Sequence, residues 1–467
     1  MERIFCLVIL FLSFHFFVKS QARFTPDGGG ELSMQQQSNC LSTLDYQRIE
    51  TDIQFHVDSL RLEGINFYSQ SESIVLLDWP LKKAVGFNWN SFYRITNFID
   101  HDTTVALQDY HCDQRTYDGH RGTDIALWPF SWHMVNNDLA EVVAAADGVI
   151  VQKYDGENDD HCSWGLPGGW NAVFIKHTDG STAWYGHLKK NSVTTKPIGQ
   201  AVVKGEYLGI VASSGVSTGP HLHFEIRDSN NAVIDPWGGT CNTWNAGCFV
   251  NQKANREPTM NALLTHDTVP VHGCPSMNEF PYFQNTFFPG DTIHCAAYYH
   301  DQLLGDTTYF RLRRPDNTVY QSWQHGAPNT YTSSWWRWRR LLPNTEPYGV
   351  WTLEADYKGL TQIHTFNYGV FPTGINEVNK RPDLAIYPNP TASKSIIKFI
   401  PSHSAHYKIY VYNVLGKRIE TLLDAEVKKS NKIQVLQFNK GKNSAGLYFI
   451  GLYQNGVLVG QESLMLQ

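Results

Sequence analysis

Short runs in which apolar and polar residues alternate dominate this chain, and they predict β-strands far more often than helices. Between residues 267 and 371, runs such as TIHCAAYYH, TYFRLRRP and GVWTLEADY are separated by Pro and Gly. The runs IIKFI, YKIYVYNV, KIQVLQF and GLYFIGLY continue this pattern near the C-terminal end. Such spacing is typical of strands joined by tight turns. We therefore predict a β-sandwich over 267–371 and a C-terminal β-sandwich over 383–467.

The N-terminal end has a different pattern. An apolar run over residues 4–18 follows Arg3 and precedes the small residues Ser20 and Ala22. This order is typical of a secretory signal peptide, which we predict over residues 1–22. No later run approaches the roughly 20 apolar residues that cross a bilayer, so we expect no transmembrane segment in the mature chain.

Composition supports a folded protein of several domains. The 467 residues are 42% hydrophobic and 18% charged, which excludes a disordered chain. The formal net charge of −6 gives no basis for a nucleic-acid partner, because phosphate contacts require a basic surface. No Trp or Cys follows Trp351, and residues 380–467 carry 12 Lys+Arg against 5 Asp+Glu. This shift predicts a domain boundary near 372–383. Alternation is weaker over 23–110, which we interpret as an N-terminal segment or a prosegment.

Cysteine usage agrees with export to an oxidising compartment. Seven cysteines follow the signal peptide, at positions 40, 112, 162, 241, 248, 274 and 295. They allow three disulfides with one cysteine left over, and their connectivity stays open. One arrangement joins 112 to 162, 241 to 248 and 274 to 295, which leaves Cys40 unpaired.

Three short motifs between residues 110 and 240 contain the residue types of a metal site. They are H-R-G-T-D with His120 and Asp124, Y-G-H with His187, and G-P-H-L-H-F-E with His221 and His223. A lone histidine is more often structural than a ligand, but the ordered combination is far more specific. If the last motif is a strand, residues two apart face the same way, so His221 and His223 enter one site. Two imidazoles and a carboxylate suit catalytic zinc, which takes three protein ligands.

Residues 112–238 resemble the lysostaphin-type zinc endopeptidases, which cut peptidoglycan cross-bridges and other glycine-rich peptides. The resemblance runs through DGHRGTDIALWPF, AAADGVIVQKYDG, NAVFIKHTDGSTAWYGHL and IGQAVVKGEYLGIVASSGVSTGPHLHFEI. It implies a compact antiparallel β-sheet core, and we place the peptidase domain at 111–240. The expected fold is therefore mainly β, with a peptidase core followed by two sandwiches.

The resemblance also implies a role for each residue of the three motifs. His120, Asp124 and His223 would bind one zinc ion per chain, and His187 and His221 would be the catalytic pair that does not bind it. Zinc makes hydroxide available near neutral pH, and a neighbouring histidine can carry the proton to the leaving amine. We assign that base to His221, and expect His187 to orient the water or to stabilise the oxyanion.

Four further residues have two interpretations each. Glu225 either holds the His223 ring from behind or is a structural carboxylate. Tyr117 and Tyr185 are either additional donors in the site or packing residues. His177 lies in the turn-like sequence KHTDG, and we interpret it as structural.

The aromatic run WWRWRR over residues 335–340 is the other local feature. On a strand, Trp336 and Trp338 share one face, and Trp335, Arg337 and Arg339 share the other. The first pair then packs in a sandwich core. The second set is either ordinary surface or an exposed strip that binds glycan or anionic cell wall.

The segment over residues 383–467 is similar to the C-terminal sorting domain of the type IX secretion system, through LAIYPNP, VYNVLGK and AGLYFI. This similarity implies the type IX machinery as a partner and a route through the periplasm to the outside or the cell surface.

The resulting hypothesis is a secreted zinc metalloendopeptidase that acts on peptidoglycan or glycine-rich peptides. The alternative is a non-catalytic cell-wall-binding or regulatory relative. A further hypothesis concerns latency, in which Cys40 or Asn39 occupies the open zinc position until the N-terminal segment is removed.

Overall fold

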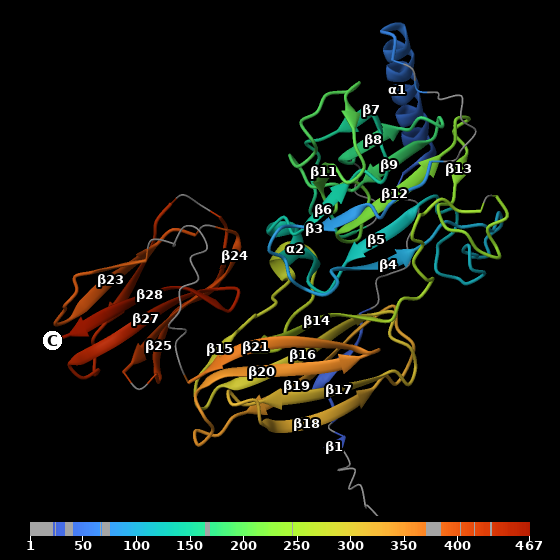
Figure 1. Cartoon of the computed structure of the whole chain (residues 1–467). Helices are drawn as coiled ribbons and strands as arrows, with labels where there is room; N and C mark the ends of the chain where they lie inside the picture. Colours follow the sequence, from blue (N-terminus) through green and yellow to red (C-terminus); the bar gives the residue numbers. More distant parts are fainter. Residues whose placement is uncertain are drawn as a thin grey trace, which may run out of the picture.

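The computed structural model shows a mainly β protein, as the sequence predicts, with three β-rich bodies (Figure 1). It describes residues 22–23, 25–32, 41–65, 67, 75–163, 169–244, 246–369, 384–401, 403–414, 416–429 and 432–467. Almost all of the predicted signal peptide, and both Asn39 and Cys40, lie outside these residues. In the described part of the chain, no helix is long and apolar enough to cross a membrane.

The first body contains the three histidine motifs and is built from two antiparallel sheets. The larger has the order β10-β7-β8-β9-β12-β5-β4, with β13 also paired to β12. Its strands are β4 (Tyr93–Asn97), β5 (Thr123–Leu127), β7 (Gly148–Tyr154), β8 (Ala172–Lys176), β9 (Thr182–Gly186), β10 (Ala201–Val202), β12 (His221–Arg227) and β13 (Val233–Ile234). The smaller has the order β11-β6-β3, with β3 (Leu81–Lys83), β6 (Ala140–Val143) and β11 (Tyr207–Ile210). The short helix α2 (Ser131–Asn136) follows β5.

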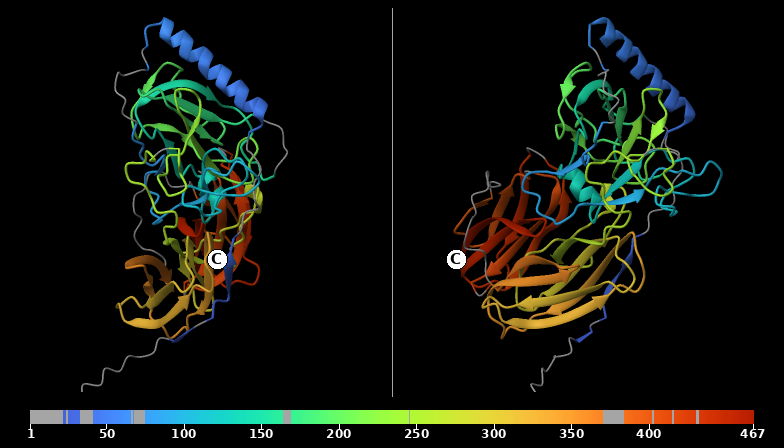
Figure 2. Two further views of the ribbon diagram at one scale, coloured as in Figure 1. Left: turned by 90° about the vertical axis from the view of Figure 1, so that its right-hand side faces the viewer. Right: turned by 45° about the vertical axis from the view of Figure 1, so that its right-hand side comes forward.

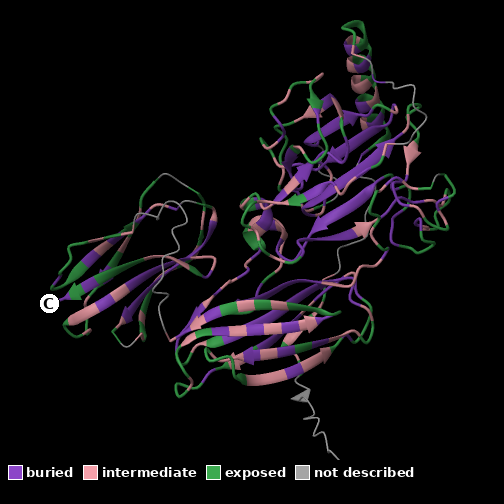
Figure 3. Ribbon diagram, in the orientation of Figure 1, coloured by how far each residue is buried: buried purple, intermediate pink, exposed green. Residues whose placement is uncertain are grey.

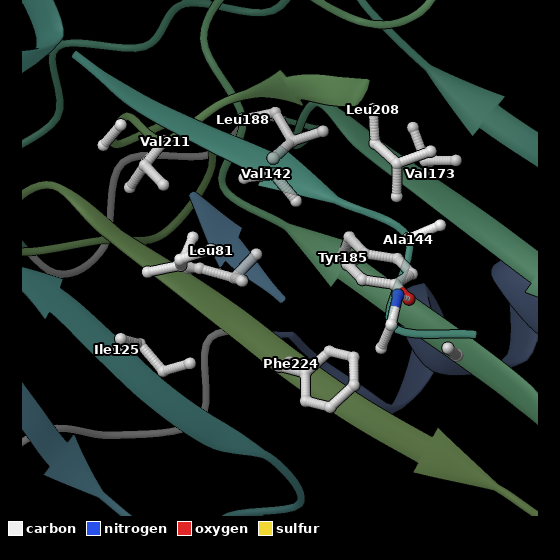
Figure 4. Packing of buried hydrophobic residues seen from close by; sticks show 14 of the residues in the cluster. Leu81, Ile125, Val142, Ala144, Val173, Tyr185, Leu188, Leu208, Val211 and Phe224 are labelled. Carbon is white, nitrogen blue, oxygen red and sulfur yellow. Dashed lines mark hydrogen bonds between the residues drawn. The ribbon is translucent and has the colours of Figure 1, made fainter. Parts of the chain in front are cut away.

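The hydrophobic core of this body lies between its two sheets (Figure 4). Leu81 and Val142 reach it from the smaller sheet, and Ile125, Tyr185 and Phe224 reach it from the larger one. Because side chains alternate along a strand, the apolar residues of β12 fill this core and its His and Glu residues occupy the opposite face. The alternation in H-L-H-F-E-I-R therefore separates the packing side of the sheet from the side that bears the site.

Helix α1 (Thr43–Leu62) covers part of that opposite face (Figure 2). Its N-terminus is closed by a capping box between Ser42 and Asp45, which satisfies backbone N–H groups that the helix leaves unpaired. Tyr46, Ile49 and Leu60 belong to its buried stripe, which packs against strand residues of β7, β8 and β9. With both faces covered, every residue of β5, β8, β9 and β12 is buried (Figure 3).

The second body is a β-sandwich that also takes in strands before residue 267, the lower of the predicted bounds. One sheet has the order β14-β16-β19-β2 and the other β1-β18-β17-β20-β21-β15. Its strands are β1 (Ala22–Arg23), β2 (Gly28–Glu31), β14 (Thr259–His266), β15 (Thr286–Phe287), β16 (Thr292–His300), β17 (Thr307–Arg313), β18 (Val319–Gly326), β19 (Ser333–Leu341), β20 (Gly349–Tyr357) and β21 (Leu360–Tyr368), with a 3-10 turn at Ser276–Asn278. Residues 23–110 are therefore divided between two bodies, because β2 joins the sandwich while α1, β3 and β4 belong to the first body.

One glycine of strand β2 is required for a steric reason. Its residues pair antiparallel with β19, so that Gly29 lies opposite Trp336. A Cβ atom at Gly29 would lie 2.1 Å from the Trp335 carbonyl oxygen, and its φ of +127° is unfavourable for L side chains. At Gly30 the φ is +137°, but no atom lies within 4 Å of an added Cβ. The run GGGE therefore pairs closely with β19, although it lacks the alternation of apolar and polar residues expected of a strand.

The aromatic run on β19 divides as the strand pattern predicts, but it forms no exposed strip. Trp336 and Trp338 are buried in the sandwich core. Trp335 packs instead among aromatic residues between the sandwich and the first body, and the Arg337 side chain is buried beside His294 and Asp27. Only Arg339 stays largely exposed, where it pairs with Asp27. The second face of β19 is covered where Trp335 packs against the first body, and β2 pairs with the free edge of the strand.

The third body is a smaller sandwich formed by the C-terminal residues. Its sheets have the orders β22-β23-β26 and β25-β24-β27-β28. The strands are β22 (Ala385–Tyr387), β23 (Lys394–Phe399), β24 (Ala405–Asn413), β25 (Arg418–Val427), β26 (Gln434–Asn439), β27 (Gly446–Gln454) and β28 (Val457–Leu466). It contacts the second body through an ion pair between Lys408 and Asp267 and through the rings of Phe288 and Tyr412, whose centroids are 4.6 Å apart.

The disulfides differ from the arrangement considered above. Cys112 bonds to Cys241 and Cys162 bonds to Cys274. Among the described cysteines, Cys248 and Cys295 are free and buried. Pairing 112 with 162, 241 with 248 and 274 with 295 is therefore wrong, because each bond joins loops that the fold brings together from more than 100 positions apart. The bond from Cys162 connects the first body to the sandwich segment between β14 and β16.

Candidate metal centre

The pairing of β12 with β5 places the central residues of two motifs directly opposite each other. His223 lies across from Asp124 in this antiparallel register. His120 precedes β5 in the turn that leads into it, and Gly122 lies between the two. A Cβ atom at Gly122 would lie 2.6 Å from the His223 ring. Glycine at this position therefore lets the turn approach β12 closely enough for His120 to reach the same point.

Three polar atoms of these residues converge. The Asp124 Oδ1 atom lies 3.2 Å from His120 Nε2 and 3.0 Å from His223 Nδ1, and the two nitrogens are 3.4 Å apart. In a tetrahedral zinc site with bonds of about 2.0–2.2 Å, neighbouring ligand atoms are separated by roughly 3.3 Å. The spacing of the three atoms therefore fits such an ion, and the residues are buried.

The hydrogen bonds on the far side of each ring fix which nitrogen faces the centre. His120 Nδ1 donates to the Phe98 carbonyl at 2.6 Å, and His223 Nε2 donates to Glu225 Oε2 at 3.3 Å. The inward nitrogens, His120 Nε2 and His223 Nδ1, then carry lone pairs that point at a carboxylate oxygen. Three acceptors in contact repel one another unless a cation lies between them. The donor set therefore fits a metal ion.

Asp124 is held in its ligand form. The Asn97 amide donates to its second oxygen, Oδ2, at 3.0 Å. Burial alone would raise the pKa of Asp124, but the neighbouring His120 and His221 outweigh it and hold the pKa well below its ordinary value. The carboxylate is thus ionised and oriented at neutral pH.

Two further imidazoles flank the three converging atoms. His221 Nδ1 donates to the Gly219 carbonyl at 2.8 Å, and its Nε2 lies 3.7 Å from Asp124 Oδ1. His187 Nδ1 donates to the Ser214 carbonyl at 2.6 Å, and none of the described residues hydrogen-bonds to its buried Nε2. The two ring centroids are 4.3 Å apart. Burial lowers the pKa of His221, and it lowers that of His187 well below the ordinary value. Both rings are therefore neutral bases.

This region of the chain matches a known protein family. Residues 119–236, which include all five of these side chains, match the model of Peptidase family M23. This chain carries an M23 peptidase domain. Residues 385–461 match the secretion system C-terminal sorting domain, so the third body is a sorting domain.

Curated relatives match only part of this chain. The DD-carboxypeptidase/endopeptidase Mpg of Neisseria meningitidis is 42% identical over 94 residues, which are 20% of this chain and 18% of the relative. Lysostaphin of Staphylococcus simulans is 40% identical over 143 residues, 27% of each chain. The glycyl-glycine endopeptidase ALE-1 of Staphylococcus capitis is 36% identical over 99 residues, 20% of this chain and 24% of the relative. The chain thus spans between 18% and 27% of the length of these relatives.

The remaining residues singled out from the sequence have different places in the M23 domain. Tyr117 stacks on the His120 ring, with centroids 4.2 Å apart. Tyr185 points into the core, where its hydroxyl accepts a hydrogen bond from the Ala145 N–H, so it is not a donor in the site. His177 Nδ1 donates to the Asp147 carbonyl in the turn, which is a structural contact. Glu225 lies behind His223, in agreement with the first of its two interpretations.

Sequence reasoning missed Asn97 and Arg227. Arg227 forms an ion pair with Glu225 through its Nε atom at 2.7 Å. The period of two along β12 could have found it, because His221, His223, Glu225 and Arg227 are all two residues apart. No signal marks Asn97, since β4 supplies it from a separate strand and the register of that strand depends on the fold.

Proposed function

We propose that this protein is a secreted zinc metalloendopeptidase that hydrolyses peptide bonds in peptidoglycan cross-bridges or glycine-rich peptides. The observation that supports it best is the convergence of three lone pairs beside two neutral imidazoles. His120, Asp124 and His223 would hold the ion. When bound, zinc supplies a Lewis acid that polarises the scissile carbonyl and makes water acidic enough to attack near neutral pH.

In this mechanism His221 transfers the proton and His187 orients the attacking water. His221 takes the proton of the attacking water at Nε2 and returns it to the leaving amine, while its Nδ1–H stays bonded to Gly219. His187 accepts a second hydrogen bond from the water at its own Nε2 and so orients it. The carbonyls of Gly219 and Ser214 fix both rings in the tautomer that this role needs.

The substrate class is supported by the relatives. One is named for glycyl-glycine bonds and another as a DD-carboxypeptidase and endopeptidase. The sorting domain supports passage through the periplasm and recognition by the type IX machinery, which would deliver the enzyme outside the cell or to its surface. A non-catalytic relative is not favoured, because the chain keeps all five side chains in one cluster.

A metal measurement on the purified protein tests this function. We expect one zinc per chain by elemental analysis, loss of cleavage after chelation, and recovery when zinc is returned. A panel of peptidoglycans and glycine-rich peptides, analysed by mass spectrometry, identifies the bond that is cut. Full cleavage by the metal-free protein, or no cleavage of any substrate by the zinc-loaded protein, would overturn the proposal.

A further inference from the structure

Helix α1 is connected to the candidate ligand His223 by a chain of charged contacts. Glu50 of α1 contacts Arg227 Nη1 through its Oε1 atom at 2.5 Å. Arg227 Nε contacts Glu225 Oε1 at 2.7 Å, and the other oxygen, Glu225 Oε2, accepts the His223 Nε2 hydrogen bond. A residue of the N-terminal segment is therefore three contacts away from the ring that would bind the metal.

Because the inner members of this series of contacts are buried, its geometry depends on Glu50, the residue at the exposed end. The side chains of Glu225 and Arg227 are 0% and 3% exposed, whereas Glu50 is 32% exposed. A buried arginine is costly when its charge is left uncompensated, and its planar fork can bridge two carboxylates at once. Arg227 does so between Glu225 and Glu50. Without Glu50, one end of the guanidinium loses its ionic partner.

Aromatic contacts from α1 and β9 hold the same guanidinium in place. The Arg227 guanidinium carbon lies 5.0 Å from the centroid of the Tyr46 ring and 4.3 Å from that of Trp184. Tyr46 also receives the Arg121 guanidinium at 4.4 Å, and Arg121 follows the candidate ligand His120. Helix α1 thus contacts both segments that bring ligands to the centre. These contacts are those of a supporting element, since α1 also buries a stripe of apolar residues in the same domain.

We propose that Glu50 is a positioning residue for the metal site, which acts on His223 through Arg227 and Glu225. This inference rests on the proposed function, because it takes His223 as a metal ligand. In this arrangement Arg227 fixes the Glu225 carboxylate, and that carboxylate fixes the tautomer and orientation of the His223 ring. Residues 43–62 are then part of the catalytic unit, and their removal would weaken the site instead of releasing it from inhibition.

Zinc affinity in the full chain tests the proposal, measured by competition with a chromogenic chelator. Loss of a partner in direct contact with a ligand typically costs about 10–100-fold in metal affinity. Glu50 is two contacts further out, so we expect Glu50→Gln to weaken zinc binding by roughly 10-fold or somewhat less. The visible absorption spectrum of the cobalt-loaded protein should shift, and cleavage at saturating zinc should return close to that of the parent chain.

Asp58→Asn is the matched control, because it removes a charge from an exposed position of the same helix that pairs only within α1. It should leave zinc affinity and the cobalt spectrum unchanged. A second variant, Arg227→Lys, keeps the charge but cannot bridge two carboxylates, and it should weaken zinc binding at least as much as Glu50→Gln. Adding Glu50→Gln to Arg227→Lys should then cost little more, as expected for residues that act through one contact chain.

The outcomes separate this inference from the proposed function. A parent chain that binds no zinc refutes the function itself. A parent chain that binds zinc, with Glu50→Gln identical to Asp58→Asn, refutes the positioning role alone. Fully additive losses in the double variant would likewise refute it, because Glu50 would then act independently of Arg227.

Discussion

At the scale of single residues, the distance from each ring nitrogen to Asp124 Oδ1 distinguishes the candidate ligands from the proposed catalytic pair. The inward nitrogens of His120 and His223 lie within 3.2 Å of Asp124 Oδ1, whereas the nearest nitrogen of His221 is 3.7 Å from it. In the described part of the chain, no hydrogen bond or ion pair joins His187 to Asp124. His187 therefore lies outside the group of three converging atoms.

Single substitutions should reproduce this distinction. Replacement of His120, Asp124 or His223 by Ala should lower zinc content, because two protein ligands remain. His187→Ala and His221→Ala should keep zinc but lose on the order of 10²–10⁴-fold in the cleavage rate, the usual contribution of general acid–base and oxyanion groups. Elemental analysis and a peptide assay on the same samples check both results. Loss of zinc in His221→Ala equal to that in His223→Ala would contradict the assignment.

A histidine far from the site should show a pH dependence of its own. Burial alone would lower the pKa of His406, but its hydrogen bonds to Asp424 and Glu426 raise it to about 9. Since the folded pKa lies above the unfolded value near 6.5, this pair stabilises the sorting domain fully below pH 6.5. The stabilisation is lost as the pH rises through about 9.

The His406 ring can be observed directly. In protein labelled with ¹³C-histidine, one ring signal should titrate near pH 9, and it should be absent from His406→Gln. Titration of that signal at or below pH 6.5 would show that the two carboxylates do not hold the charged form. Calorimetry of the full chain should show a smaller loss of stability between pH 6.5 and 9 in His406→Gln than in the parent chain.

The five positions of the cluster could be predicted from the sequence because their residue types are chemically restricted and their spacing fits strands. The partners that orient them could not. Phe98, Gly219 and Ser214 contribute backbone carbonyls, which any residue could supply, so no side chain signals their role. The direction of Tyr185 was also open, since the strand face it occupies depends on the register of β9 with β12.

At the scale of elements, strand β12 was the most predictable and strand β2 the least. The alternation in β12 indicates its two faces directly, whereas GGGE in β2 has no side chains that could alternate. Helix α1 has a clear signal in the sequence. Its apolar residues Tyr46, Ile49, Ile53, Val57 and Leu60 recur every three or four residues, as expected for one buried helical stripe.

The steric need for glycine in β2 gives a prediction at this scale. Gly29→Ala should cost on the order of 1–3 kcal/mol, because the new methyl group would collide with the Trp335 backbone in an unfavourable region of φ. Gly30→Ala shares the positive φ but meets no neighbour, so its cost should be smaller, about 1 kcal/mol. Calorimetry measures the difference, and amide exchange in β19 should rise more in Gly29→Ala. Equal effects would mean that backbone strain, and not the contact, selects glycine.

At the scale of the whole molecule, division into domains was predictable but the connections between them were not. The change in charge and in Trp and Cys content near residue 380 lies just before the residues that match the sorting domain, 385–461. Disulfide connectivity depends on which loops the finished fold brings together, and Cys162–Cys274 joins two separate bodies. The split of residues 23–110 between two bodies likewise has no local signal in the chain.

The sorting domain gives a prediction about location. Removal of residues 383–467 should leave peptide cleavage unchanged, because all candidate catalytic residues lie in the M23 domain, and the protein should accumulate in the periplasm. Activity assays and immunoblots of periplasmic and extracellular fractions check this, with the full chain as control. Truncated protein outside the cell in normal amounts would refute the sorting role.

The pairing of β2 with β19 also constrains the order of folding. The backbone N–H of Asp27, next to β2, donates to the Arg337 carbonyl, and these partners are 310 positions apart. Closing so long a loop carries a large entropic cost, and contacts of high sequence separation form slowly. Strand β2 must therefore wait, unpaired, until the chain is complete to Arg337, nearly three quarters of the way along its 467 residues. On the export route proposed above, this delay would leave the sandwich incomplete while the chain is threaded across the first membrane.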